Sequence, residues 1–566
     1  MRPALGLAAL LLVPAAAAQS GSGVNTSGAP LTPEAAAIDV QHYALDLTID
    51  PARRHFDGTL EVLARVVAPT DAVVLQLDDA FTVGEVRFCQ EPCGERGAIP
   101  VERTPGALRA SFGYTAQPGD EITVVVDYAG APPVAERPPW SGGVTWAQTD
   151  DGRPWVAVSC QFEGGDVWWP VKDHPSDEPD AGMRIALTVP KDLRGIANGA
   201  FQDRTVRGDW ATERWRVTTP INNYGVSFGV APYEEVALDY TGSLGTEMRV
   251  PFYVLPERRA DAEKQLPGFL DAIDFLERTF GPYAFAEDGY KVLHTPYLGM
   301  EHQSLIAYGS TFEDNAYGFD WLHFHELAHE WWANAGTAPD WNDFWIHESF
   351  ANYAEALYAE DIARRAGGDA RAAYLSYIAQ VRGNIVNVLP VAPREPRTTK
   401  QMYNLPDGRF NGDIYFKGSW FLHTLRFLFQ DDDAFMGAFP GILLTADGPR
   451  FVSTSDVRSA FSDALHGVRP DAPPLDPYFE AYLRHAELPR LVTTLSPTGA
   501  FADFEWVVPE GIEGFELPVP VQIGDNLPGG GRYEIVPMPG GRGRIGVGDR
   551  VTLEVDPLGE ILFATE

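Results

Sequence analysis

Two histidines, His325 and His329, stand four residues apart, and Glu326 directly follows the first of them. On a helix, residues four apart lie one turn apart on the same face, so both imidazoles can bind one metal ion. Glu326 can then reach a water molecule on the metal without occupying the metal itself. The spacing therefore predicts a helix at this point and a metal site that activates water.

A metal ion that serves hydrolysis is held by three protein ligands and keeps one position open. Glu348 is the predicted third ligand, because it lies 19 residues after His329 on the next predicted helix. His323 and His347 are alternative ligands, but each lies one or two residues off the relevant helix face. Glu355 returns to the face of Glu348 and is predicted to orient a ligand histidine, a solvated glutamate being the alternative.

The hydrophobic pattern changes twice along the chain and divides it into three folded parts. Apolar and polar residues alternate over most of residues 38–238, which is typical of an antiparallel β domain of sandwich or saddle type. Helical spacing dominates residues 239–490, and short β runs between turns return in residues 491–566. We therefore predict a multidomain α+β protein with a β domain, a central helical catalytic domain and a small C-terminal β domain.

The first residues have the pattern of a secretory signal peptide, residues 1–18. Arg2 precedes the apolar run from Ala4 to Val13, and a run of alanines forms a small-residue cleavage site, so cleavage is expected after Ala18. Residues 19–37 are predicted to be a flexible leader. No later stretch reaches about 18 apolar residues, so we expect a secreted or periplasmic protein without stable membrane insertion.

The formal net charge of −36 limits the class of partner. A surface this acidic repels phosphate backbones, which excludes nucleic acid as an expected partner, and it attracts small cationic ligands. Cys89 and Cys93 lie four residues apart in a loop rich in proline and glycine. The sequence is compatible with a local disulfide between Cys89 and Cys93 and equally with two free thiols. If the disulfide forms, Cys160 is unpaired.

The metal pattern, His325-Glu326-x-x-His329 with Glu348, resembles the gluzincin zinc aminopeptidases, specifically the M1 peptidase family of aminopeptidase N and the leukotriene-epoxide hydrolase. Three further segments carry the resemblance: Gly299-Met300-Glu301-His302, Cys160-Gln161-Phe162-Glu163 and Ile414-Tyr415-Phe416-Lys417-Gly418. They are similar to the family segments Gly-x-Met-Glu-Asn, Thr-Gln-x-Glu and Tyr-x-Lys-Gly. Together the matches span roughly residues 40–490.

The resemblance implies a thermolysin-like catalytic domain that holds one Zn²⁺ per chain through His325, His329 and Glu348. It implies that Glu326 is the general base and that Tyr415 stabilises the oxyanion of the transition state. The expected activity is that of a secreted zinc aminopeptidase, which hydrolyses the N-terminal residue from peptides.

The resemblance also implies how a peptide with a free N-terminal amine would bind. Glu301 and Glu163 are expected to bind the amine, and Gln161 to line the pocket for the first side chain. The backbone at Gly299 and Met300 is expected to align the peptide. His302 stands where the family has asparagine, so the peptide contact at that position is expected to change.

Two other departures from the family pattern are Cys160 in place of threonine and His347 in place of asparagine. Neither removes a zinc ligand, the base or the tyrosine. Short β runs follow the catalytic part where larger relatives have a long C-terminal helical domain, so a more open cleft is expected.

Three other functions remain open at this point: an epoxide hydrolase of the leukotriene type, a non-catalytic peptide-binding member of the same scaffold, and an endopeptidase. The epoxide hydrolase needs a long lipid cavity, and the Gln161-x-Glu163 segment is more similar to the aminopeptidases. A binding module is expected to lose a ligand or the base, and all four residues are present. The preferred first residue, the physiological substrate and the oligomeric state are not set by the sequence.

Overall fold

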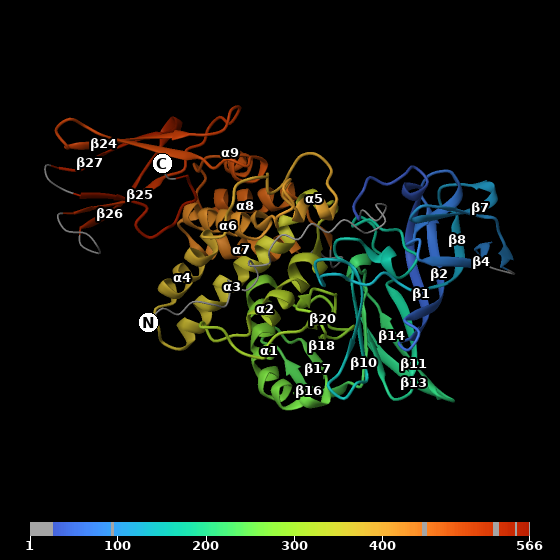
Figure 1. Cartoon of the computed structure of the whole chain (residues 1–566). Coiled ribbons are helices and arrows are strands. Elements are labelled where there is room, and N and C mark those ends of the chain that lie inside the picture. Colours follow the sequence, from blue (N-terminus) through green and yellow to red (C-terminus); the bar gives the residue numbers. More distant parts are fainter. Residues whose placement is uncertain (1–26, 92–95, 444–449, 525–530, 549–551, 565–566) are drawn as a thin grey trace.

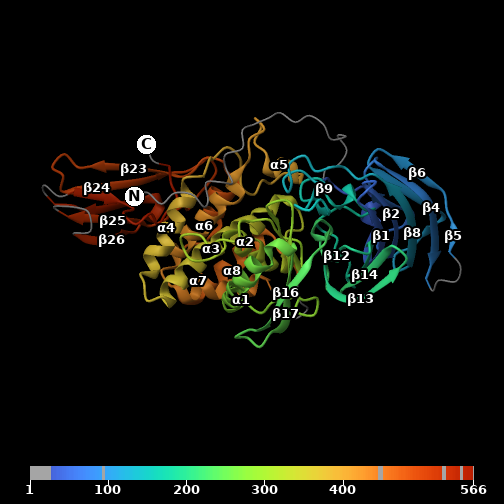
Figure 2. The same ribbon diagram turned by 60° about the horizontal axis from the view of Figure 1, so that its bottom comes forward.

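The computed structural model describes residues 27–91, 96–443, 450–524, 531–548 and 552–564. Three parts follow one another along the molecule (Figures 1 and 2): an N-terminal β domain at one end, a helical domain in the middle and a second, smaller β domain at the other end. The predicted α+β organisation is thereby confirmed. The predicted signal peptide, residues 1–18, lies outside the described residues.

The N-terminal domain is built on an eight-stranded sheet in the order β13-β14-β11-β1-β2-β8-β4-β5. Its neighbours pair antiparallel except β1 and β11, which pair parallel. A three-stranded sheet, β3-β7-β6, and a four-stranded sheet, β12-β15-β10-β9, complete the domain. The strands are β1 (Ile38–Asp50), β2 (His55–Val66), β3 (Thr70–Gln76), β4 (Phe81–Gln90), β5 (Gly97–Ala98), β6 (Val101–Thr104), β7 (Ala107–Ala116), β8 (Glu121–Gly130), β9 (Gly143–Gln148), β10 (Pro154–Ser159), β11 (Met183–Pro190), β12 (Arg194–Ala197), β13 (Ala200–Arg207), β14 (Trp210–Val217) and β15 (Phe228–Ala231).

The helical domain begins with a five-stranded sheet in the order β16-β17-β18-β20-β19. Its first strand, β16, starts at Glu234, so the predicted domain boundary at residue 238 falls inside a strand that pairs with β17. Alternation continues through β16, and the sequence pattern alone could not assign this strand to the following domain. The strands are β16 (Glu234–Thr241), β17 (Glu247–Val254), β18 (Lys291–His294), β19 (Gly299–Met300), β20 (Leu305–Tyr308), and the short pair β21 (Gly336–Thr337) and β22 (Arg450–Phe451).

Helices cover this sheet and supply most of the central domain. They are α1 (Arg259–Phe280), α2 (Trp321–Ala328), α3 (Trp345–Arg365), α4 (Ala370–Arg382), α5 (Thr399–Tyr403), α6 (Phe416–Phe429), α7 (Asp432–Leu443), α8 (Thr454–Val468) and α9 (Asp476–Phe479). Helix α3 is buried over nearly its whole length, from Trp345 to Asp361, and packs against α2, α4 and α6. It is therefore the central support of the domain.

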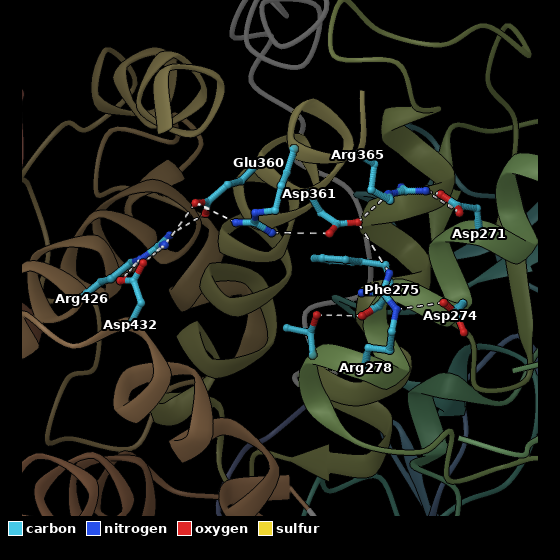
Figure 3. Close-up of polar contacts among 11 residues, drawn as sticks. Asp271, Asp274, Phe275, Arg278, Glu360, Asp361, Arg365, Arg426 and Asp432 are labelled. Atoms are coloured by element: carbon cyan, nitrogen blue, oxygen red, sulfur yellow. Dashed lines mark hydrogen bonds and ion pairs between the residues drawn. The ribbon is translucent and has the colours of Figure 1, made fainter. Parts of the chain in front are cut away.

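The C-terminal end of α3 is fixed by a network of charged side chains (Figure 3). Arg426 of α6 is 6% exposed and its Nη1 lies 2.8 Å from Oε2 of Glu360. Asp361 lies 2.9 Å from Nε of Arg365 and 3.6 Å from Nη2 of Arg278 on α1. Exposed ion pairs contribute little each, but loss of one member of the buried Arg426–Glu360 pair would leave the other with an exposed partner only, Asp432 or Arg364. The network thus ties α3 to its neighbours on both sides.

The C-terminal domain consists of two three-stranded sheets, β23-β24-β27 and β26-β25-β28. The strands are β23 (Arg490–Leu495), β24 (Phe501–Val507), β25 (Val519–Gly524), β26 (Arg532–Val536), β27 (Arg542–Gly546) and β28 (Thr552–Val555). After β28 the chain returns to the helices, where Arg382 donates hydrogen bonds to the carbonyls of Ile561 and Phe563. The small C-terminal β domain that the sequence predicts is confirmed.

Part of the predicted leader lies against the folded body. Ser27 is buried, and its carbonyl accepts a hydrogen bond from the backbone N–H of Thr399, 3.2 Å away, at the start of α5. Cys89 is disulfide-bonded, Cys93 lies outside the described residues, and Cys160 is a buried free thiol. Among the helices of the described residues, none has the length and apolar character needed to cross a bilayer.

Candidate functional site

Helix α2 presents the two predicted histidine ligands from one face. Asp320 caps its N-terminus by accepting a hydrogen bond from the backbone N–H of His323, 3.1 Å away. The apolar residues Phe324 and Leu327 are fully buried on the opposite side. This packing turns His325 and His329 toward α3, where Glu348 lies in the first turn.

The three predicted ligands meet at one point. Nε2 of His325 lies 3.2 Å from Nε2 of His329, and Oε2 of Glu348 lies 3.5 and 3.4 Å from these two nitrogens. Ligand atoms about 2.0–2.1 Å from a tetrahedral zinc ion would be about 3.3 Å apart, which matches this triangle. Oε2 of Glu348 is buried without a hydrogen-bond partner among the described residues. The three side chains therefore fit one tetrahedral metal ion.

Hydrogen bonds on the far side of each imidazole fix its orientation. Nδ1 of His325 lies 2.7 Å from Oε1 of Glu355, whose other oxygen accepts a hydrogen bond from the hydroxyl of Tyr377. Nδ1 of His329 lies 3.0 Å from the carbonyl oxygen of Trp332. Because Nδ1 donates in both cases, each Nε2 presents its lone pair to the centre.

The two alternative histidines lie elsewhere. Nε2 of His323 is 2.7 Å from the hydroxyl of Tyr290, and its ring stacks on Phe269. Nε2 of His347 accepts a hydrogen bond from the backbone N–H of Ala338, 2.9 Å away. Both rings are buried, and burial lowers the pKa of His347 to about 3. Neither of them joins the triangle of ligand atoms.

Glu326 lies beside the triangle and faces the same cavity. Burial raises its pKa to about 8, and the nearby carboxylates of Glu301 and Glu348 act in the same direction while the histidines oppose them. The strand β19 passes directly against this carboxylate. A Cβ atom at Gly299 would lie 2.5 Å from Oε1 of Glu326, so only glycine allows this approach.

Glu301 has a carboxylate oxygen within 4.8 Å of Glu326 and His329 and is held by two neutral donors. Nε2 of Gln161 donates to Oε1 of Glu301 at 2.8 Å, and the hydroxyl of Tyr224 donates to the same oxygen at 3.2 Å. Burial raises the pKa of Glu301. No cationic side chain is bonded to this carboxylate in the described part of the chain. Gln161 and Glu301 are thus brought together beside the metal triangle.

Two predicted substrate-binding residues do not line this cavity. Glu163 forms an ion pair with Nζ of Lys400, 3.1 Å away, and accepts a hydrogen bond from the backbone N–H of Gly142. His302 is fully buried, and neither of its ring nitrogens has a hydrogen-bond partner among the described residues. Burial lowers the pKa of His302 to about 3, so the ring is neutral.

The cavity over the site has apolar walls from two domains. Most of its surface comes from the helical domain, but the N-terminal domain also contributes, through the loop after β8 and through Gln161. The wall residues whose side chains are apolar are Pro139, Trp140, Leu298, Met300, Trp321, Leu322 and Phe416. Of these, Met300 and Phe416 lie in the segments that carry the family resemblance, and the others were not predicted as site residues. The loop residues could not be found from spacing, because they lie far from every motif in the chain.

Tyr415 stands at the start of α6 with its ring centroid 6.0 Å from that of His325. Its hydroxyl lies 3.2 Å from the hydroxyl of Tyr403, which in turn donates to Oε1 of Glu348 at 2.5 Å. Tyr403, which ends the five-residue helix α5, is not among the site residues predicted from the sequence. Nothing in the pattern around Tyr403 indicates its contact with Glu348.

Comparison with known proteins agrees with this geometry. Residues 296–464, which include the metal triangle, Glu326 and Tyr415, match the Peptidase family M1 domain. Aminopeptidase N of Haemonchus contortus is 25% identical over 329 residues, which are 54% of this chain and 32% of that protein. Glutamyl aminopeptidase of Homo sapiens is 25% identical over 348 residues, 56% of this chain and 34% of that protein. The chain thus spans about a third of the length of the curated relatives it matches.

Solved structures cover much more of the chain. The M1 zinc metallopeptidase of Deinococcus radiodurans is 25% identical, with a TM-score of 0.61 over 80% of this chain and 95% of that one. A variant of the same enzyme bound to a Tyr-Ser-Ala substrate gives a TM-score of 0.63 at 24% identity, with the same coverage. The shared fold thus reaches well beyond the residues of the matched domain.

Proposed function

We propose that this chain, whose residues 296–464 match the Peptidase family M1 domain, is a zinc aminopeptidase that releases the N-terminal residue of peptides. One observation carries the proposal. The unpartnered oxygen of Glu348 faces two imidazole nitrogens at 3.4 and 3.5 Å, with the carboxylates of Glu326 and Glu301 beside them. The donor set of two imidazoles and one carboxylate suits zinc, and it leaves a fourth position open.

The reaction proposed here divides the work between the metal and the side chains of the cavity. Zinc held by His325, His329 and Glu348 would polarise the scissile carbonyl and lower the pKa of a water molecule. Glu326 accepts the proton of the attacking water on its carboxylate and passes it to the leaving amine. The hydroxyl of Tyr415 donates a hydrogen bond to the oxygen that becomes negative in the transition state.

We assign to Glu301 the selection of substrates that have a free N-terminal amine. A protonated α-amine would donate to its carboxylate, which two neutral donors already hold in place and which has no cationic partner among the described residues. A buried carboxylate binds a cation far better than a neutral amide does. The apolar wall around Met300 and Trp321 suits an aliphatic or aromatic first side chain. Export of the protein is proposed from the pattern of residues 1–18 alone.

A pair of substrates that differ only at the amine tests this function. Leucine p-nitroanilide should be hydrolysed, whereas N-acetyl-leucine p-nitroanilide, which lacks the charge that Glu301 binds, should be cleaved at least about 100-fold more slowly. Equal cleavage of both would indicate an endopeptidase. No cleavage of either by the zinc-loaded protein, over a panel of first residues, would indicate a binding protein.

The two candidate amine-binding carboxylates are expected to behave differently. Glu301→Gln should lower kcat/KM for leucine p-nitroanilide about 10- to 100-fold, because it removes a charge-assisted hydrogen bond to the amine. Glu163→Gln is the matched variant, and it should change kcat/KM by less than about threefold because its carboxylate is bonded to Lys400. Equal losses in the two variants would show that Glu163 also reaches the substrate amine.

A further inference from the structure

Helix α5 brings one tyrosine against the proposed metal centre. Tyr403 ends this helix, and its side chain is 1% exposed. Its ring centroid lies 4.2 Å from that of Phe162, in the segment that follows β10, and 5.2 Å from that of Phe344, directly before α3. Rings from both domains therefore hold Tyr403 in one position.

The hydroxyl of Tyr403 forms a hydrogen bond with one of the two carboxylate oxygens of Glu348. It donates to Oε1 at 2.5 Å, and Nε2 of Gln161 is a weaker neighbour of the same atom at 3.5 Å. The other oxygen, Oε2, has no hydrogen-bond partner in the described part of the chain and faces the two imidazoles. A carboxylate bonded in this way cannot rotate about its terminal bond without losing the bond to Tyr403.

The same hydroxyl also touches Tyr415. An ionised Glu348 can only accept hydrogen bonds, so the hydroxyl of Tyr403 must use its proton to donate to Oε1. The oxygen of Tyr403 can then only accept from the hydroxyl of Tyr415, 3.2 Å away. Tyr415 is therefore held with its O–H group beside the metal ligand before substrate arrives.

We propose that Tyr403 is a positioning residue of the zinc site, which fixes the binding oxygen of Glu348 and holds the hydroxyl of Tyr415. This inference rests on the proposed function, and it adds a residue that no motif of the chain predicts. Tyr403 touches neither the substrate nor the metal. It affects metal affinity because it positions Glu348, and it affects turnover because it positions Tyr415.

Zinc affinity gives the first test, which does not depend on activity. Tyr403→Phe should raise the zinc Kd about 10- to 100-fold, as measured by competition with a fluorescent chelator, because outer partners of metal ligands have effects of this size. The matched control is Tyr353→Phe. That residue is a buried tyrosine whose hydroxyl lies 2.9 Å from that of Tyr374 and does not contact the centre. Its zinc Kd should stay within about twofold of wild type, and an equal Kd for Tyr403→Phe and wild type would overturn the proposal.

Turnover at saturating zinc gives the second test. Tyr403→Phe should lower kcat about tenfold, because the hydroxyl of Tyr415 is no longer held in place. KM should stay within about twofold, because Glu301, which binds the substrate amine, is unchanged. In a Tyr415→Phe background the same substitution should change kcat by less than about twofold. A full tenfold loss in that background would show that Tyr403 does not act through Tyr415.

The two proposals fail in distinguishable ways. If wild type neither binds zinc nor hydrolyses leucine p-nitroanilide, the proposed function is wrong. If wild type does both and Tyr403→Phe matches it, only the role of Tyr403 is wrong. Should Tyr403→Phe not fold by circular dichroism, 3-fluorotyrosine at position 403 keeps the hydroxyl. Its fluorine resonance should shift on zinc loading while a label at position 353 does not, and no shift at 403 would overturn the proposal.

Discussion

Glu326→Gln should lower kcat by roughly 10²- to 10⁴-fold while zinc stays bound, which is the range expected for loss of a general base. Glutamine keeps the shape of the side chain but accepts no proton from the attacking water. Three other residues, His325, His329 and Glu348, form the metal triangle, so the zinc content should stay at one per chain. The measurements are kcat for leucine p-nitroanilide and zinc by atomic emission on the same sample.

Two controls accompany this variant. Glu326→Asp keeps a carboxylate but shortens it, and it should retain more turnover than Glu326→Gln. The melting temperature of Glu326→Gln should stay close to that of wild type, since glutamine keeps the volume and shape of this buried side chain. Wild-type turnover by Glu326→Gln would remove Glu326 from the mechanism.

Removal of the metal should abolish turnover, and one equivalent of zinc per chain should restore it. Oε2 of Glu348 is buried and has no hydrogen-bond partner among the described residues, and the carboxylates of Glu301 and Glu326 lie close to the same ligand atoms. A ligand that binds only the folded state stabilises it by about 2.7 kcal/mol at a free concentration 100 times its Kd. The apoprotein should therefore melt at a lower temperature than the zinc form.

The control for metal removal is a variant that cannot hold the metal. Glu348→Gln should bind zinc far more weakly, and added zinc should raise its melting temperature much less than that of wild type. Magnesium, which prefers octahedral oxygen ligands, should not restore turnover of the apoprotein. Activity that persists in chelator with no zinc left on the protein would contradict the proposed metal centre.

The metal triangle could be predicted because local geometry sets most of it. His325 and His329 share a face of any helix. Because the connection to the next helix is short, that helix returns across α2 and brings Glu348, in its first turn, to the histidines. Glu355 follows from the same periodicity, and its carboxylate is found 2.7 Å from Nδ1 of His325. The order of β, helical and β parts was likewise visible, since alternation and helical spacing differ clearly.

The surroundings of the triangle could not be predicted, because they depend on how distant elements pack. Gln161 and Glu163 are two residues apart, yet one contacts Glu301 and the other pairs with Lys400 of α5. That difference arises from the position of α5, which no spacing encodes. The hydrogen bond from Tyr403 to Glu348 has the same origin. Spacing identifies which residues share a helix face, and packing decides which of them meet.

The walls of the cavity come from two domains, with Trp140 and Gln161 on one side and Trp321 on the other. The proposed metal ligands and base all lie on the helical domain, whereas the wall that faces a substrate is shared between that domain and the loop after β8. Substitutions in the loop that carries Trp140 are expected to change the shape of the cavity without moving the metal ligands on the helices. A chimaera that exchanges the loop around Trp140 between homologues is therefore expected to change only part of the substrate preference, while the residues of the metal triangle remain those of the recipient.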